Sequence, residues 1–312
     1  MKNNIKKKKY NTIIIGLGSV GMGYKYDNII FSHSQSIQRH KKFNLLAGID
    51  IKKRNREVFS KKFKKPAFQD LSNFKGSKID VVIISCPEQQ HLKILLQIIK
   101  KLNVKLILIE KPCGTNYMET KKILNICKLN KIKVLVNYQR NYNKSFDEII
   151  KILKNKKLKG FFWYSKQIRN NCSHFINFLL RLSKQSFKIK NVGSKNKGNF
   201  ILYNDQVYIN FLKTIEKKKI INECDLISNN YRITSKNDFN DFNIFSSQKS
   251  NFFQNYSEYS ERGKLLLTNY KKTQFQILDN IVKIFEENKK IDFDRFNIET
   301  SLVLDKIQKI LK

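Results

Sequence analysis

Three glycines with the spacing Gly-x-Gly-x-x-Gly follow a short apolar run at residues 13–15. In a strand–turn–helix setting the first glycine makes the turn, the second lets backbone N–H groups approach a pyrophosphate, and the third lets the following helix pack closely. The residues of this turn are Gly16, Gly18, Ser19, Val20 and Gly21. Taken alone, the pattern is equally consistent with a glycine-rich turn that binds no ligand.

A carboxylate, Asp50, follows the next apolar segment at residues 44–49. At the end of a second strand, a carboxylate can accept hydrogen bonds from the ribose hydroxyls of a dinucleotide. Its distance from the glycines exceeds the roughly 20 residues of the usual fingerprint, because residues 22–28 interrupt the start of the next helix. A solvated aspartate at a strand end explains Asp50 equally well, and the basic residues 52–54 leave room for the 2′-phosphate of NADP.

Further polar clusters stand directly after three other apolar segments. Cys86, Pro87 and His91 follow residues 80–85, Glu110 and Lys111 follow residues 105–109, and Asn137, Tyr138 and Arg140 follow residues 133–136. A lysine that is partly desolvated near a positively charged ring can have a lowered pKa and transfer protons. Among so many lysines, Lys111 would otherwise be an ordinary surface residue.

Strands and helices alternate through the first 140 residues. Helical periodicity predicts helices at residues 32–40, 54–63, 91–101 and 116–129, between the apolar strand segments. This alternation is typical of a doubly wound parallel sheet, in which ligands bind at the carboxyl ends of the strands. Residues 1–140 are therefore predicted to form an α/β dinucleotide-binding domain of the Rossmann type, with the polar clusters gathered at that edge.

Residues 141–312 follow a different pattern. A helix at 144–153 precedes a strand at 161–166 and a polar turn at 169–177, which leads into an apolar helix. Strand-like runs follow at 199–203, 207–212, 220–227 and 231–234, then a loop-rich stretch at 238–261, then helices at 266–287 and 297–311. We predict an α+β domain with a largely antiparallel open sheet. Its C-terminal helices are free to pack back on the first domain.

The polar turn contains His174, one of only four histidines in the chain. An imidazole placed there can exchange a proton near neutral pH, although a capping or core histidine is the alternative. Trp163 and Tyr164, in the preceding strand, are expected to fill a sheet interface. His33 follows the interrupted segment, and the sequence gives little reason to place it in the site.

The chain carries a formal net charge of +37. A strongly basic balance is common among nucleic-acid-binding proteins, but the lysines are spread along the chain and arginine, which reads base edges, is scarce. Nucleic acid is therefore not the expected partner. The five cysteines are scattered, which argues against a disulfide framework or a metal site. No apolar run is long enough to cross a bilayer, and a reducing, cytoplasmic setting is expected.

The sequence Glu110-Lys111-Pro112, with the glycine turn, the Cys-Pro-x-x-x-His turn and the second domain, resembles the Gfo/Idh/MocA oxidoreductase family over essentially the full length. Residues 21–24, 136–140 and 163–175 resemble a branch associated with bacterial lipopolysaccharide and surface-polysaccharide biosynthesis. The resemblance implies hydride transfer between NAD(H) or NADP(H) and a secondary alcohol or ketone of a sugar, cyclitol or nucleotide sugar. Asp50 favours NAD, and a homo-oligomer is implied.

The resemblance also assigns roles residue by residue, with Lys111 and His174 as catalytic residues. The implied cofactor-binding residues are Gly16, Gly18, Ser19, Val20, Gly21, Asp50, Cys86, Pro87, His91, Glu110 and Asn137, and the implied substrate contacts are Tyr138, Arg140, Asn170 and Asn171. Many members have aspartates where this chain has Asn170 and Asn177, and asparagine cannot stabilise an imidazolium with a full charge. The acid and base roles therefore stay open, as does a non-catalytic alternative, a dinucleotide- or sugar-sensing regulatory protein with the same fold.

Overall fold

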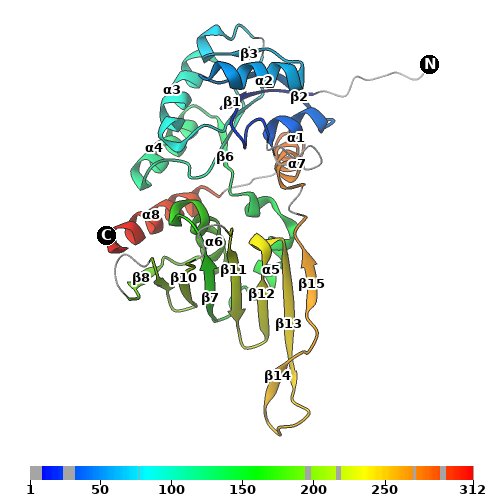
Figure 1. The fold of residues 1–312 in the computed structure, drawn as a ribbon, viewed down its shortest axis with the longest axis vertical. Coiled ribbons are helices and arrows are strands. Elements are labelled where there is room, and N and C mark those ends of the chain that lie inside the picture. The colour runs from blue at the N-terminus through cyan, green and yellow to red at the C-terminus, as the bar shows by residue number, and fades with distance from the viewer. Residues whose placement is uncertain are drawn as a thin grey trace, which may run out of the picture. The chain divides into compact units, whose positions relative to one another are not determined.

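The computed structural model describes residues 9–23, 32–76, 78–193, 198–215, 219–269, 272–288 and 293–311. The chain divides into two compact units (Figure 1). Unit 1 comprises Met1–Tyr142 and Lys271–Asn297, and unit 2 comprises Asn143–Tyr270 and Ile298–Lys312. Unit 1 is thus built from two separate stretches of sequence. Most of the predicted interruption at residues 22–28 lies outside the described residues.

Unit 1 contains a six-stranded parallel sheet. Its strands are β1 (Tyr10–Ile15), β2 (Phe43–Ile49), β3 (Ala67–Phe68), β4 (Val81–Ile84), β5 (Leu106–Ile109) and β6 (Lys133–Val136). They lie in the order β3-β2-β1-β4-β5-β6, and every pair is parallel. All residues of β4 and β5 are buried and apolar, as expected where helices cover both faces of a sheet. The predicted doubly wound sheet is confirmed.

The helices of unit 1 come from both stretches of the chain. They include α1 (His33–Arg39), α2 (Lys53–Phe63), α3 (His91–Lys101), α4 (Tyr117–Leu129), the short 3-10 helix η3 (Gln139–Tyr142) and α7 (Thr273–Glu286). Ile277, Leu278, Ile281 and Ile284 form one apolar stripe on α7 and are buried in the same core as Tyr10 of β1. The core of unit 1 therefore includes a helix from near the end of the chain.

Unit 2 is built on a nine-stranded sheet (Figure 1). Its strands are β7 (Leu158–Tyr164), β8 (Lys188–Asn191), β9 (Phe200–Tyr203), β10 (Val207–Lys213), β11 (Asn222–Ile227), β12 (Tyr231–Ser235), β13 (Asp241–Lys249), β14 (Ser257–Tyr259) and β15 (Lys264–Leu267). The pair β7–β10 is parallel, and the other described pairs are antiparallel. The predicted, largely antiparallel sheet is confirmed.

Helices cover one face of this sheet. They are α5 (Lys144–Leu153), α6 (Ile168–Ser183) and α8 (Asp294–Leu311), the first turn of which belongs to unit 1. Phe175 of α6 stacks on Phe162 of β7 at 4.4 Å between ring centroids, and both rings are fully buried. On the opposite face, Phe161 and Tyr208 are 43% and 42% exposed. The sheet is therefore open on one side, as predicted.

The polar turn predicted around His174 is wrong, because α6 begins at Ile168 and includes the whole segment. The polar residues of the segment favour turns and caps when they are considered locally. However, Cys172, Phe175 and Ile176 are buried on one side of the helix, and this burial outweighs the local preference.

Two more boundaries in the second half of the chain differ from the prediction. Residues 264–267 form β15, which pairs with β13, and α7 begins only at Thr273. A short apolar run fits a strand or a helix equally well, and pairing with β13 decides between them. The stretch predicted to be rich in loops contains the long strand β13, whose Phe242 and Ile244 alternate with more exposed residues. Its Asn and Ser residues concealed that alternation.

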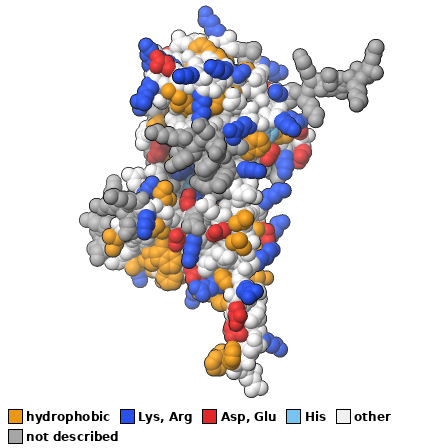
Figure 2. Space-filling view, turned by 45° about the vertical axis from the view of Figure 1, so that its right-hand side comes forward, with side chains coloured by type: hydrophobic (Ala, Val, Ile, Leu, Met, Phe, Trp, Pro, Cys, Tyr) orange, Lys and Arg blue, Asp and Glu red, His pale blue; other side chains and the backbone are white. Residues whose placement is uncertain are grey.

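Lys and Arg side chains are scattered over the face of the protein seen in Figure 2 and do not gather into one patch. This distribution agrees with the spread of lysines along the sequence. Each helix in the described part of the chain is too short or too polar to cross a bilayer.

Candidate functional site

The polar clusters that follow the strands of unit 1 lie along one edge of its sheet. The backbone N–H groups of Gly16, Glu110 and Asn137 each donate to the last residue of a neighbouring strand, at 2.8–2.9 Å. These bonds extend the sheet by one residue beyond the strands. Because β2, β1, β4, β5 and β6 are successive neighbours, the residues after them share the carboxyl edge, where such sheets bind ligands.

The glycine turn after β1 uses its three glycines differently. Gly16 has a φ of +97°, and a Cβ there would lie 2.6 Å from the backbone nitrogen of Cys86. A Cβ on Gly21 would lie 2.0 Å from the carbonyl oxygen of Gly16. A Cβ on Gly18, by contrast, would meet no atom of the described residues within 4 Å. The fold itself requires the first and third glycines, whereas the space beside the second is open on the exposed side of the turn.

Asp50 holds this turn against the end of β2. Its Oδ2 accepts hydrogen bonds from the backbone N–H of Leu17 at 2.7 Å and from Asn55 Nδ2 at 3.1 Å. Its Oδ1 accepts one from the backbone N–H of Lys52 at 2.7 Å. A carboxylate oxygen has two lone pairs, so Oδ1 can still accept a hydroxyl hydrogen bond. Asp50 is therefore a fixed part of the edge and more than a solvated strand end.

The turn after β4 is tied to its neighbours on both sides. Ser85 Oγ donates to the carbonyl oxygen of Gly16 at 2.7 Å. The buried His91 ring lies 2.9 Å from the carbonyl oxygen of Cys86 through Nε2, and 2.9 Å from that of Cys113 through Nδ1. Burial raises the pKa of the Cys86 thiol to about 11, so this thiol is neutral near pH 7. The cluster is suited to shaping a binding surface, while Pro87 stands exposed on it.

Glu110, directly after β5, is the centre of a buried polar group. Its Oε1 lies 2.8 Å from Nε2 of His33 and accepts a hydrogen bond of 2.5 Å from Asn137 Nδ2. Asn137 Nδ2 is also 3.4 Å from Oε1 of Gln274 on α7. Desolvation opposes ionisation of Glu110, but the His33 and Asn137 contacts and the Lys111 charge together hold its pKa below the usual value. The carboxyl group is therefore ionised despite its burial.

Lys111 follows Glu110 directly and is half-buried. The peptide bond from Lys111 to Pro112 is cis, and Pro112 is buried. Next to Asn137, Tyr138 is buried and Arg140 is half-buried on η3. Unit 1 thus supplies Lys111 and two of the four predicted substrate contacts from two adjacent strand ends.

Unit 2 supplies the other predicted residues from a single helix, α6. His174 and Asn171 are half-buried and stand one helical turn apart, and Asn170 is exposed. Asn171 Nδ2 donates to Asn222 Oδ1 at 3.1 Å, and Asn170 Nδ2 donates to Gln167 Oε1 at 3.2 Å. The structure therefore groups the predicted residues into two sets, one at the sheet edge of unit 1 and one on α6.

Asn177, which stands where many family members have an aspartate, is fully buried in unit 2. Its Nδ2 donates to Thr300 Oγ1 of α8 at 2.9 Å. This contact joins two helices of unit 2, so Asn177 has a structural partner in this chain.

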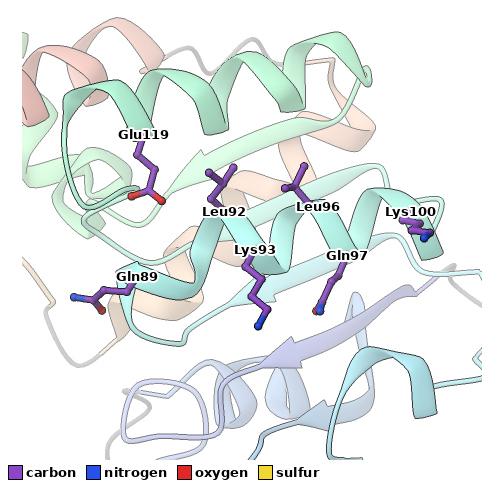
Figure 3. A pocket seen from close by; sticks show the side chains of 7 residues that line it. All are labelled: Gln89, Leu92, Lys93, Leu96, Gln97, Lys100 and Glu119. Atoms are coloured by element: carbon purple, nitrogen blue, oxygen red, sulfur yellow. The ribbon is translucent and has the colours of Figure 1, made fainter.

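Two surface cavities lie away from these residues. One, of about 560 Å³, lies between α3 and α4 and is lined by side chains that include Leu92, Leu96 and Glu119 (Figure 3). The other, of about 770 Å³, lies on unit 2 and is lined by side chains that include Trp163 and Tyr259. Neither includes a predicted site residue. Among the described residues, no three His, Cys, Asp or Glu side chains gather in a way that could hold a metal ion.

Several residues of the sheet edge were missed or undervalued in the sequence. His33 received little weight, and Ser85, Asn55 and Gln274 received none. Serine and asparagine at such places are common in loops, and Gln274 lies more than a hundred residues from its partner. Only the sequence Glu110-Lys111-Pro112 indicated the buried polar group around Glu110.

Residues 10–138 match the family model GFO_IDH_MocA, described as an oxidoreductase family with an NAD-binding Rossmann fold. This part of the chain is similar to the Gfo/Idh/MocA family. The predicted resemblance to that family is therefore confirmed. No curated protein matches the sequence.

Solved structures match over nearly the whole chain. The dehydrogenase MviM of Clostridium difficile has a TM-score of 0.75 and 14% identity, with 97% of this chain and 99% of that chain covered. The WlbA dehydrogenase of Chromobacterium violaceum, solved with NADH and UDP-GlcNAcA, has a TM-score of 0.72 and 12% identity, with 98% and 95% covered. Gal80p of Saccharomyces cerevisiae, solved as a super-repressor mutant, has a TM-score of 0.73 and 12% identity, with 96% of each chain covered. These similarities show a shared fold.

Proposed function

We propose that this protein is an oxidoreductase that uses NAD(H) or NADP(H) to interconvert a secondary alcohol and a ketone on a sugar, a cyclitol or a nucleotide sugar. The observation that carries the proposal is the turn after β1, which leaves open space at Gly18 while Asp50 fixes its position. The family match of residues 10–138 supports the same activity.

The residues at the sheet edge fit a nicotinamide dinucleotide. The exposed backbone at Gly18 and Ser19 suits a pyrophosphate, since no side chain of the described residues lies within 4 Å of a Cβ placed on Gly18. Asn137 is fully buried, and its Oδ1 has no hydrogen-bond partner among the described residues. This oxygen suits the N–H group of a nicotinamide carboxamide. When bound, the nicotinamide supplies or accepts the hydride.

The remaining residues of the edge complete the proposed cofactor site. Val20 and Gly21 close the turn, Cys86, Pro87 and His91 shape the adjoining surface, and Glu110 orients Asn137 through their 2.5 Å hydrogen bond. Asp50 favours NAD over NADP, because a fixed carboxylate accepts from a ribose hydroxyl and repels a 2′-phosphate.

Lys111 is proposed to exchange a proton with the reacting oxygen of the substrate. Glu110 stands directly before Lys111 in the sequence, and the contact with the buried His33 helps to keep its carboxyl group ionised. His174 is proposed to take the second proton-transfer role from α6. Tyr138, Arg140, Asn170 and Asn171 are proposed to bind the substrate.

A nucleotide sugar is the favoured substrate class, and surface-glycan biosynthesis the favoured setting. The similar WlbA structure holds NADH with UDP-GlcNAcA. The net charge of +37 would also attract an anionic diphosphate group to the protein. We further propose that the protein acts in the cytoplasm as a homo-oligomer formed through the open sheet face of unit 2, which light scattering after size exclusion would test.

The test is a panel of sugars, cyclitols and nucleoside diphosphate sugars, the last including UDP-GlcNAcA, assayed in both directions by absorbance of the reduced nicotinamide. NADH binding is measured in parallel by fluorescence titration. Turnover with at least one member, dependent on NAD or NADP, is expected. Tight NADH binding without turnover of any sugar or cyclitol would contradict the proposed activity.

The second candidate is a non-catalytic regulator that senses a dinucleotide or a sugar. The likeness to Gal80p, solved as a super-repressor mutant, and the asparagines at 170 and 177 favour it. It predicts ligand binding without turnover and a protein partner whose affinity for this chain changes when NADH or the sugar is added.

A further inference from the structure

Three polar side chains of unit 2 form a continuous chain of hydrogen bonds. Asn171 on α6 donates through Nδ2 to Asn222 Oδ1 at 3.1 Å. Asn222, the first residue of β11, donates through its own Nδ2 to Asp238 Oδ1 at 2.6 Å. The second bond is short for a nitrogen donor, as expected where the acceptor is charged. Asn222 is 6% exposed, so a mismatched amide there would be costly.

The Asp238 carboxylate fixes the donor-to-acceptor direction of these hydrogen bonds. Asp238, when ionised, can only accept hydrogen bonds. Asn222 must therefore turn its NH₂ group toward Asp238 and its oxygen toward Asn171. Asn171 must then turn its own NH₂ group toward Asn222. An asparagine amide on its own can face either way, so the charge at Asp238 decides which polar atom Asn171 presents on its other side.

The backbone around Asp238 is held in a conformation that residues other than glycine rarely adopt. Asp238 has a φ of +58° and Phe239 a φ of +60°. Phe239 is buried, with its ring centroid 5.7 Å from that of Phe175, and Thr268 Oγ1 donates to its carbonyl oxygen at 2.9 Å. The packing therefore fixes a turn that would otherwise relax. Such enforced conformations concentrate at functional sites.

We infer that Asp238 is a positioning residue, which orients Asn171 so that its Oδ1 accepts a hydrogen bond from a hydroxyl or amide N–H group of the substrate. This inference rests on the proposed function, in which Asn171 contacts the substrate. Because Asn171 stands one helical turn from His174, the acceptor lies on the same side of α6 as the proposed proton-transfer residue. Phosphate and carboxylate groups, which only accept hydrogen bonds, are disfavoured beside it.

The kinetic test uses the nucleotide sugar that turns over fastest in the panel. Asp238→Asn is expected to raise its KM about tenfold, to leave kcat within about twofold, and to leave NADH binding unchanged. Adding Asn222→Asp to this variant is expected to restore the KM to within about threefold of the original, since a carboxylate at position 222 accepts from both neighbouring amides. A merely structural role for Asp238 would not give this rescue.

Asp225→Asn is the matched control, because Asp225 lies on the same strand as Asn222 but pairs with Arg232 at 2.6 Å instead. It is expected to leave the KM unchanged. If Asp238→Asn behaves like this control, or if it lowers kcat and NADH binding as much as sugar affinity and is not rescued, the inference is overturned.

A second measurement does not depend on turnover. Thermal unfolding is compared for Asp238→Asn, Asn171→Leu and the two together. Coupled residues are expected to give a combined shift smaller than the sum of the single shifts. Additive shifts in the unfolding temperature would overturn the inference that Asp238 orients Asn171, even if the enzyme is active. Absence of turnover across the whole panel would instead contradict the proposed function, and with it the substrate role of Asn171.

Discussion

Nε2 of His33 lies 2.8 Å from Oε1 of Glu110, and only 2% of the His33 side chain and 13% of the Glu110 side chain are exposed. The pair joins the start of α1 to the turn after β5. A buried carboxylate is stable only while its partners remain, since removal of one partner leaves an uncompensated charge. The stability of the buried Glu110 carboxylate, directly before Lys111, therefore depends on His33, which lies 77 positions earlier in the sequence.

His33→Leu should be strongly destabilising. It removes the partner of Glu110 and leaves that carboxylate buried, which costs about 3 kcal/mol in the free energy of unfolding. His40→Leu is the control, because His40 lies 3.2 Å from Asp279, whose side chain is 57% exposed and stays hydrated. The control should lose less than about 1 kcal/mol. Urea unfolding measures both, and equal losses would contradict the role given to the buried pair.

Glu110 should also make stability depend on acid pH. Its folded pKa lies below the usual value of 4.5, so the pair's stabilisation is complete above pH 4.5 and is lost as the pH falls through the folded pKa. In that range the unfolded chain binds a proton that the folded chain does not, and the free energy of unfolding falls. Glu110→Gln should give a flatter acid limb in urea unfolding between pH 3 and pH 6. Parallel curves for the two proteins would argue against an ionised Glu110.

Two glycines of the same turn should respond oppositely to alanine. Gly16→Ala places a Cβ against the Cys86 nitrogen at a positive φ, and it should lower stability by about 1–3 kcal/mol. The methyl group of Gly18→Ala meets no atom in the described part of the chain and should leave the melting temperature unchanged. Because it fills the space proposed for the pyrophosphate, it should weaken NADH binding at least about tenfold. Unchanged NADH binding in Gly18→Ala would place the dinucleotide elsewhere.

Lys111→Met and His174→Gln should each lower kcat by about 10²–10⁴-fold, the range expected for loss of a proton-transfer residue. NADH binding should change less than about threefold in either variant, because neither residue is placed against the dinucleotide phosphates. Lys93→Met, at an exposed lysine on α3, provides the control for loss of one positive charge. Stopped-flow absorbance of the nicotinamide separates the chemical step from product release. A kcat that survives both substitutions would refute the assigned roles.

The sheet of unit 1 could be predicted closely because its signals are local. The central strands β4 and β5 are short buried apolar runs, and α3 shows a clear helical periodicity. Asn116 caps α4 by accepting from the backbone N–H of Glu119, close to the predicted start of this helix. The carboxyl edge followed from topology alone, since parallel strands end on the same side.

The parts that the sequence did not reveal depend on contacts between distant residues. β15 became a strand through pairing with β13, and α6 became a continuous helix through burial of one side. The partners of Glu110 are His33 of α1 and Asn137, which follows β6, and Asn137 in turn contacts Gln274 of α7. Asp238 stands in an irregular turn without any local motif. Propensity and periodicity carry no information about such partners, so the prediction of the site stopped at the residues that carry family motifs.

The contribution of α7 to the core of unit 1 has a consequence for synthesis of the protein. A nascent chain that has emerged only as far as Tyr142 has all six strands of the parallel sheet but lacks the apolar stripe of α7 that packs against Tyr10 and Phe43. Its exposed apolar surface stays uncovered while the ribosome adds more than a hundred further residues. The first domain in sequence is therefore expected to complete its fold only after most of unit 2 has been made, and to need protection from aggregation during that interval.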